Sequence, residues 1–239
     1  MKYSGGAISS FSINGELTRS SIPNISYVVE VVIGAGVTSI GNSAFSGCDW
    51  LSSVTIPNSV TSIKMHAFND CPKLTSVKIP GSVKNIGYEA FKYCNALSNL
   101  IIESGVISID VGAFNPCRAL TSVTIPDGVK SIGRYAFSGC DKLSSVTMPD
   151  SVTDIGEWAF AVCPYTSLTI GSGVSSIGSL AFLDAALTDI TFRGKTVAEV
   201  QAMENYPWGI KASALPSMQI HSDIDIRGSN IKSLMPITQ

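Results

Sequence analysis

An internal repeat limits the fold of this chain more than any other feature of its sequence. The dipeptide Ala-Phe recurs with six phenylalanines spaced 23 residues apart, and a seventh follows after a one-residue deletion. A cysteine stands three residues after each of the first six phenylalanines, and Ala185 takes that place in the seventh copy. A repeat of this length predicts stacked coils, because one coil alone cannot bury its apolar side. The phenylalanines are Phe45, Phe68, Phe91, Phe114, Phe137, Phe160 and Phe182.

Each coil contains two kinds of local pattern. Val54 and Ile56 alternate with polar residues, which predicts a short strand with one buried face, and Pro57 ends it. Small, turn-forming residues follow and reverse the chain. The next apolar positions, from Ile40 to Leu51 in the first coil, have a spacing that suits one or two turns of helix. The sequence therefore predicts a unit of strand, turn and short helical segment.

The repeat ends on both sides in segments of a different pattern, which we expect to cap the stack. Asn14-Gly15 between alternating apolar residues predicts a hairpin. Thr196 and Glu199 have the spacing of a capping box, which predicts a helix to about residue 205. Residues 218–226 alternate well enough for terminal strands. The expected division is an N-terminal cap at 1–30, a solenoid at 31–192 and a C-terminal cap at 193–239.

The charge of the chain argues against a nucleic-acid partner. Only 14% of the residues are charged, with 16 Lys and Arg against 18 Asp and Glu, and no basic run is present. Proteins that bind phosphate backbones carry clustered basic residues. The longest apolar stretch, residues 27–37, is interrupted by Glu30 and is too short to span a membrane. The first residues lack the apolar region of a secretory signal peptide, so the sequence leaves a cytoplasmic location open.

The repeat resembles the BspA-like, treponemal-class leucine-rich repeat, whose unit reads approximately LxxVxIPxxVxxIGxxAFxxC. The match covers about residues 31 to 192. The resemblance implies an α/β-type repeat solenoid, curved, with about seven 23-residue coils, a parallel sheet on the concave side and short helical turns on the other. It also implies a non-enzymatic role in protein binding and cell adhesion, as in bacterial surface proteins and adhesins, at the cell surface or secreted.

Two coils depart from the glycine of this pattern. Lys64 and Asp110 stand where the five other coils have glycine. If the position requires a positive φ, each of these two residues carries about 1 kcal/mol of strain.

The sequence contains little that points to catalysis or to a metal. It holds two histidines, His66 and His221, and we expect His66 to be an ordinary surface residue. The cysteines lack the paired spacing of zinc ligands and are expected to be free, buried thiols. Asp127 and Asp150 stand at equivalent positions of adjacent coils, where a glycosidase pair is conceivable, but Asp is favoured in such turns in any case. We therefore predict no enzyme, no cofactor and no metal.

Two surfaces are candidates for binding a protein. In a leucine-rich solenoid, the residues between the inward strand positions face the concave side, and here they form a mostly uncharged hydroxyl surface; threonine ladders also favour neighbouring strands for structural reasons alone. The second candidate is an aromatic stripe two residues before successive phenylalanines, at a position where chance variation is the alternative explanation. The concave-face residues are Ser53, Thr55, Ser76, Lys78, Asn99, Ile101, Ser122, Thr124, Ser145 and Thr147, and the stripe consists of Tyr135, Trp158 and Leu180.

The alternative function is self-assembly. Trp208, Ile224 and Ile226 in the C-terminal cap would then form the interface of a homo-oligomer. A protein partner of unknown identity and a second copy of the chain are thus the two partners that the sequence suggests.

Overall fold

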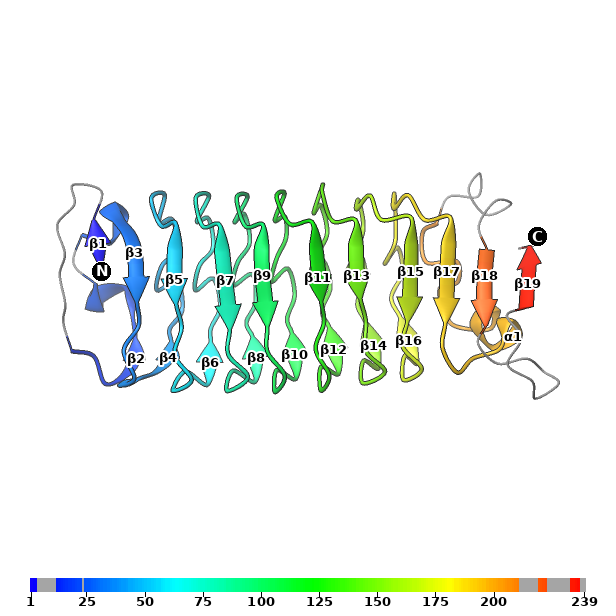
Figure 1. Cartoon of the computed structure of the whole chain (residues 1–239), viewed down its shortest axis with the longest axis horizontal. Helices are drawn as coiled ribbons and strands as arrows, with labels where there is room; N and C mark the ends of the chain where they lie inside the picture. Colours follow the sequence, from blue (N-terminus) through cyan, green and yellow to red (C-terminus); the bar gives the residue numbers. More distant parts are fainter. Residues whose placement is uncertain (4–11, 23, 211–218, 223–232, 237–239) are drawn as a thin grey trace.

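The computed structural model describes residues 1–3, 12–22, 24–210, 219–222 and 233–236. The repeats form a β-solenoid, and one strand from each turn of the chain lies beside its neighbours along the long axis of the molecule (Figure 1). We call the outward side of these strands the main-sheet face. The strands are β3 (Val28–Val32), β5 (Ser53–Thr55), β7 (Ser76–Ile79), β9 (Asn99–Ile102), β11 (Ser122–Thr124), β13 (Ser145–Thr147), β15 (Ser167–Ile170) and β17 (Asp189–Phe192).

A second parallel sheet, which the sequence did not predict, crosses the coils after the proline turn. It has eight strands in the order β16-β14-β12-β10-β8-β6-β4-β2. Each strand buries one isoleucine or leucine, and equivalent residues pair in register, as Ile63 does with Ile86. The strands are β2 (Gly15–Leu17), β4 (Val37–Ile40), β6 (Ser62–Ile63), β8 (Asn85–Ile86), β10 (Ser108–Ile109), β12 (Ser131–Ile132), β14 (Asp154–Ile155) and β16 (Ser176–Ile177).

The main-sheet face is divided between β9 and β11. The first sheet has the order β1-β3-β5-β7-β9, and the other has the order β11-β13-β15-β17-β18-β19. The division falls in the coil where Glu103 replaces the proline that ends the strand in four others. Glu103 accepts a hydrogen bond from the Gly81 N–H and forms an ion pair with Lys78 at 2.7 Å.

The phenylalanines form the centre of the core. The rings of Phe91 and Phe114 stack with centroids 5.4 Å apart, and those of Phe114 and Phe137 with centroids 5.2 Å apart. All seven are fully buried. The six cysteines are free and buried beside them, as the sequence predicts. The thiol of Cys94, for example, donates to the carbonyl oxygen of Phe68 at 3.2 Å.

The segments around the phenylalanines are turns, and not the short helices that the sequence predicts. The chain between Ile40 and Leu51 forms hydrogen-bonded turns without a helix, and the equivalent segments of the other coils do the same. The physical reason is a residue in the left-handed region two positions before each phenylalanine, since such a residue ends any helix that has begun. Helices in the described residues are η1 (Arg19–Ser21), η2 (Ile25–Tyr27) and α1 (Val197–Gln201).

The glycine position of the repeat is set by close packing, and not by a positive φ. Gly87 and Gly133 do not have a positive φ, and neither do Lys64 and Asp110. A Cβ on Gly133 would lie 2.6 Å from the backbone nitrogen of Val111 in the preceding coil. The condition for strain at Lys64 and Asp110 is therefore not met, because neither residue has a positive φ.

The N-terminal residues join both sheets of the stack. The predicted hairpin at Asn14-Gly15 is wrong within the described residues, because β2 starts at Gly15 and pairs in parallel with β4. The glycine thus belongs to a strand. β1 (Lys2–Tyr3) pairs antiparallel with β3.

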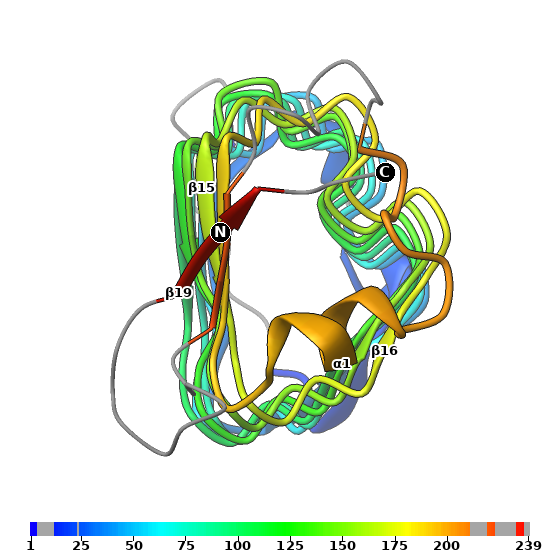
Figure 2. The same ribbon diagram turned by 90° about the vertical axis from the view of Figure 1, so that its right-hand side faces the viewer.

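The C-terminal residues close the other end, where α1 lies across the last coil (Figure 2). The capping box is confirmed, since the Thr196 side chain accepts from the Glu199 N–H and the Glu199 side chain accepts from the Thr196 N–H. The helix is shorter than predicted and ends at Gln201. β18 (Gln219–Ser222) pairs in parallel with β17, and β19 (Ser233–Pro236) pairs antiparallel with β18.

Trp208 belongs to this cap and not to an exposed interface. Its side chain is fully buried, and its ring packs against Phe182, Phe192 and Tyr206 with centroids 5.1 to 6.2 Å apart. Its indole N–H donates to the Glu204 carbonyl oxygen at 3.0 Å. The expectation that Trp208 contacts a second chain is wrong. Ile224 and Ile226 lie outside the described residues.

Candidate binding surfaces

The turn face is the surface formed by the turns around the Ala-Phe dipeptides. Coils are numbered by their phenylalanines, from coil 1 with Phe45 to coil 7 with Phe182. Two residues before each phenylalanine, φ lies between 49° and 63°. In the first six coils the N–H of this residue donates to a carbonyl oxygen of the next coil. Backbone bonds hold the position, so its side chain is free to vary; it is Ser43, His66, Glu89, Gly112, Tyr135, Trp158 or Leu180.

A groove of about 650 Å³ runs along the turn face from coil 3 to coil 6, and we call it the turn groove. Gly112 lies in it between Glu89 and Tyr135 of the neighbouring coils, so coil 4 has no side chain at this one position, and we call the gap over Gly112 the slot. A Cβ on Gly112 would have the Glu89 side chain as its nearest contact, at 3.1 Å. The turn groove is lined by Tyr88, Glu89, Lys92, Val111, Gly112, Asn115, Arg134, Tyr135, Ser138 and Trp158.

The charges in and beside the turn groove balance. Lys92 Nζ lies 2.8 Å from Glu89 Oε1, and Arg134 Nε lies 3.1 Å from Glu157 Oε2. Burial acts to lower the pKa of Lys92, but the hydrogen bond to Glu89 and the attraction of nearby negative charge together outweigh it, and the pKa lies above its usual value. Arg134 also donates from Nη2 to the Tyr135 hydroxyl at 3.0 Å. The two carboxylates are thus each engaged by a cation, and the surface has no net charge from these four groups.

Two of the three predicted stripe residues lie in the turn groove. Tyr135 and Trp158 contact each other with ring centroids 5.9 Å apart and planes tilted by 38°. Both are half-buried, and the Trp158 indole N–H donates to Glu157 Oε1 at 3.1 Å. Leu180 lies outside the groove, against Gly209 of the C-terminal cap. Tyr88 is 43% exposed and supplies the aromatic side chain on the opposite side of the slot.

The predicted concave-face residues lie on the main-sheet face in rows on both sides of the division between β9 and β11. Ser122 pairs with Ser145, Thr124 with Thr147, and Lys78 with Ile101. Ser53 and Ser76 are partly exposed and the other eight are exposed, Ile101 to 47%. The structure brings ten of the thirteen candidate residues onto this face: Ser53, Thr55, Ser76, Lys78, Asn99, Ile101, Ser122, Thr124, Ser145 and Thr147.

A shallow hollow of about 750 Å³ lies on the main-sheet face beside the division between β9 and β11. Ile101, Thr124 and Thr147 line it, together with Met148 and Arg193. Arg193 donates from Nη2 to the Met148 carbonyl oxygen at 2.9 Å. Its position is therefore fixed by a backbone contact as well as by its side-chain partner Asp150.

Two of the groups considered for chemistry, Asp150 and His66, have structural partners. Asp150 accepts from the Ser172 N–H at 2.8 Å, which is the main cause of its lowered pKa, and lies 3.2 Å from Arg193. His66 lies at the surface with its side chain partly exposed, and its Nδ1 is 3.5 Å from a Glu89 oxygen. The described residues contain no group of three His, Cys, Asp or Glu side chains placed to hold a metal ion.

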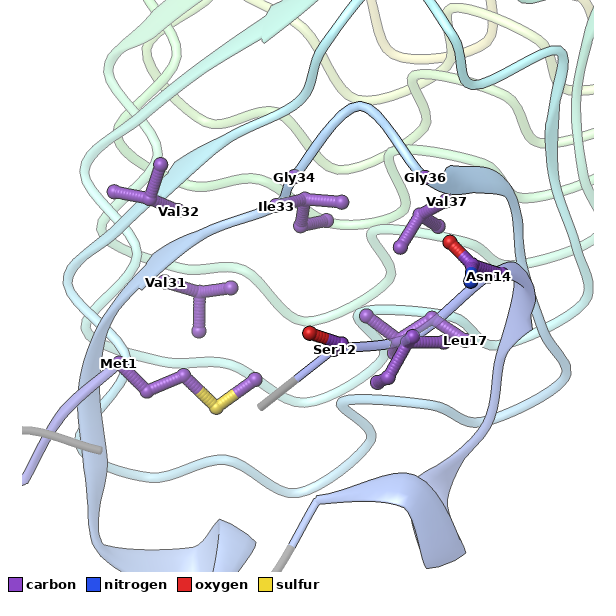
Figure 3. A pocket seen from close by; sticks show the side chains of 11 residues that line it. Met1, Ser12, Asn14, Leu17, Val31, Val32, Ile33, Gly34, Gly36 and Val37 are labelled. Carbon is purple, nitrogen blue, oxygen red and sulfur yellow. The ribbon is translucent and has the colours of Figure 1, made fainter. Parts of the chain in front are cut away.

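A smaller hollow of about 240 Å³ opens at the N-terminal end of the stack. Figure 3 shows that Met1, Val31, Ile33, Val37 and Leu17 come together there from the first turns of the chain. Its apolar lining is the end of the core, which in the middle of the solenoid is covered by the next coil.

The comparison with family models identifies the repeat. The model of the BspA type leucine rich repeat region, with six copies, matches residues 16–126 and 108–217. The chain belongs to the BspA-type leucine-rich repeat family. No curated protein matches the chain. In the described part of this family member, no helix has the length and apolarity needed to cross a membrane.

Solved structures of similar proteins come from bacteria. A leucine rich cell surface protein of Faecalibacterium prausnitzii is 39% identical with a TM-score of 0.65, over 69% of this chain and 48% of that one. The leucine rich repeat protein of T. pallidum is 27% identical with a TM-score of 0.57, over 75% and 73%. A leucine-rich repeat protein of Bacteroides ovatus, 21% identical with a TM-score of 0.53 over 87% and 55%, shows the same fold. The chain thus spans about half of the F. prausnitzii structure.

Sequence reasoning missed most of the turn groove. It identified Tyr135 and Trp158 as a stripe but assigned no role to Gly112, Asn115 or Arg134. Gly112 is the one glycine among the seven residues that stand two positions before a phenylalanine, and this is visible in the sequence. Its role in the groove becomes clear only when the structure shows that these residues have the left-handed conformation.

Proposed function

We propose that this chain is a non-enzymatic protein-binding module of a bacterial surface protein, and that the turn groove is its binding site. The observation that carries the proposal is the cluster of Tyr88, Tyr135 and Trp158 around the slot at Gly112. Tyrosine, tryptophan and arginine are the residues most enriched among binding hot spots, and Arg134 completes the set. The description of the F. prausnitzii structure as a cell surface protein supports the location.

The conformation of the aromatic residues supports the same choice of site. Tyr135 and Trp158 have φ values of 57° and 58°, and a bulky residue costs about 1 kcal/mol there relative to glycine. Gly112 shows that the fold accepts glycine at this position. Large side chains that carry such a cost and remain half-exposed are better explained by binding than by folding.

The main-sheet face is the second candidate site, because its hollow beside β9 and β11 includes an exposed isoleucine, Ile101. Its largely uncharged Ser and Thr rows would form a flat interface. Lys78 and Asn99 are the residues of this face that depart from the rows and would distinguish one partner from another.

Binding of the purified chain to a panel of extracellular-matrix and bacterial-surface proteins tests the proposal. We expect saturable binding that falls by about tenfold or more in the Tyr135→Ala/Trp158→Ala variant and is unchanged in Lys78→Ala/Asn99→Ala. The reverse pattern would move the site to the main-sheet face. If no panel member binds, the assignment as an adhesin-like module is wrong.

A further inference from the structure

The aromatic side chains across the slot of the turn groove stand on alternate coils. Tyr88 belongs to coil 3 and Tyr135 to coil 5, with Gly112 of coil 4 between them. The stacked rings of Phe91, Phe114 and Phe137 in these coils have successive centroid distances of 5.4 and 5.2 Å, and two strand spacings amount to about 9.5 Å. A polyproline II helix rises about 9.3 Å per turn of three residues. One turn of such a helix therefore nearly spans the distance between the two aromatic coils, which is about 9.5 Å by strand spacing and just over 10 Å by the stacked rings.

The hydrogen-bonding groups of the turn groove suit a chain that has acceptors and few donors. Consecutive prolines present carbonyl oxygens and no N–H groups. Lys92 has three N–H donors and Arg134 has five, and both side chains line the groove. The carboxylates of Glu89 and Glu157 are engaged by these two cations and require no donor from a ligand.

The charge balance of the turn groove favours an uncharged peptide over a charged one. A strongly acidic or basic segment gains little from a site in which Glu89 is paired with Lys92 and Arg134 with Glu157. The Arg134 guanidinium lies over the Tyr135 ring, 4.7 Å from its centroid. An uncharged, rigid and apolar segment therefore gains mainly from the exposed parts of Tyr88 and Trp158. Grooves lined with aromatic residues bind proline-rich segments in this way, and the preformed helix loses little entropy on binding.

We propose that the turn groove binds a proline-rich segment of the partner protein in the polyproline II conformation, with one of its residues seated in the slot over Gly112. This inference rests on the proposed function and names the chemistry of its ligand. The groove reaches over four coils, so it accommodates about five residues of such a helix.

The test uses a synthetic decaproline peptide and the indole N–H signals of the three tryptophans in an NMR titration. Trp158 lies in the groove, whereas Trp208 is buried in the C-terminal cap and Trp50 is not among the groove residues. We expect a saturable shift of the Trp158 signal, with the signals of Trp50 and Trp208 unchanged. A glycine-serine peptide of equal length is expected to cause no shift.

Two matched variants locate the binding to the slot. Gly112→Tyr fills the slot with a side chain that the same position already carries in Tyr135, so the backbone is expected to remain intact. Ser43→Tyr places the same residue at the equivalent position of coil 1, outside the groove. We expect at least about a tenfold loss of decaproline affinity in Gly112→Tyr and none in Ser43→Tyr.

The outcomes separate this inference from the proposed function. The inference is overturned if decaproline leaves the Trp158 signal unmoved while a panel protein still depends on Tyr135 and Trp158; the groove then binds protein of another chemistry. A Trp158 shift with oligosaccharides and none with decaproline would make the groove a sugar site and overturn both. Equal affinity of the Gly112→Tyr and Ser43→Tyr variants would place the peptide elsewhere.

Discussion

The rings of Phe45 and Phe68 lie parallel, with their centroids 4.9 Å apart and 4° between their planes. The same stacking continues to Phe160, so the aromatic core is one column through the coils. Every ring in the interior of this column has a neighbour on both sides. In a repeat protein, stability is approximately a sum of the coils and their interfaces, and a change in the middle of the column weakens two interfaces at once.

Phe114→Ala tests the contribution of the column. Phe114 is fully buried and stacked on both sides, so we expect the free energy of unfolding to fall by about 3–5 kcal/mol. Tyr93→Ala is the control, because Tyr93 is 44% exposed, and its cost is expected to stay within about 0.5 kcal/mol. Urea unfolding measures both. A similar cost for the two variants would mean that the column is not the main source of stability.

Gly133→Ala and Gly112→Ala distinguish close packing from backbone conformation. A Cβ on Gly133 would lie 2.6 Å from a backbone atom of the preceding coil, which cannot move away easily, and we expect a cost of about 1–3 kcal/mol. Gly112 has φ +63° and a flexible neighbour, so its cost is expected to be about 1 kcal/mol or less. Thermal or urea unfolding measures the loss of stability in each variant. A larger loss in Gly112→Ala than in Gly133→Ala would contradict the packing explanation.

The six thiols are expected to be unreactive in the folded protein. All are buried, and burial is the main cause that raises the pKa of Cys117 and Cys163, which lowers the fraction of reactive thiolate. Titration with a thiol reagent at neutral pH should detect six thiols in denaturant and none at short times without it. Rapid reaction of any thiol in the folded chain would show local opening of its coil.

Stability is expected to decrease at alkaline pH through the same residues. Burial raises the pKa of Cys140 from 9.0 to about 12. The folded state holds this proton more tightly than the unfolded chain, so the contribution is complete below about pH 9 and is lost as the pH rises towards 12. The urea midpoint should therefore fall between about pH 9 and 11, and less steeply in Cys140→Ala. If the urea midpoint of Cys140→Ala falls with pH as steeply as that of the native chain, groups other than Cys140 cause the loss of stability.

Trp208→Ala tests the cap at the C-terminal end. The side chain is fully buried against Phe182, Phe192 and Tyr206, so its removal should cost about 3–5 kcal/mol. The molar mass measured by light scattering is expected to be the same for the folded variant as for the native chain. A lower molar mass of the variant than of the native chain would show that Trp208 contributes to an interface between copies of the chain.

The regular parts of the fold were predictable because, in a repeat of fixed length, each buried position can be read from the sequence of several coils. Val54 and Ile56 identify one strand, and the equivalents in other coils repeat the observation. The capping box at Thr196 was predictable for a different reason, since its hydrogen bonds join residues three apart. Both kinds of signal are local in the sequence.

The turns and the turn groove were harder to predict because their geometry comes from contacts between coils. The N–H of Tyr135 bonds to Glu157 in the next coil, and this bond places a tyrosine in a conformation that the residue alone disfavours. The turn groove in turn depends on the missing side chain of Gly112 between two such residues. Nothing within one repeat distinguishes these turns from a short helix with the same apolar spacing.

On the turn face, the backbone bonds between coils fix the shape, and the side chains that vary include those of the proposed binding site. Ser43, Gly112 and Trp158 occupy the same conformation and give the same bond to the next coil, whatever their side chains. A new specificity can therefore arise by substitution in these columns while the solenoid keeps its form. Under the proposed function, a relative of this chain can therefore acquire a different partner by substitutions at this position while the fold stays the same.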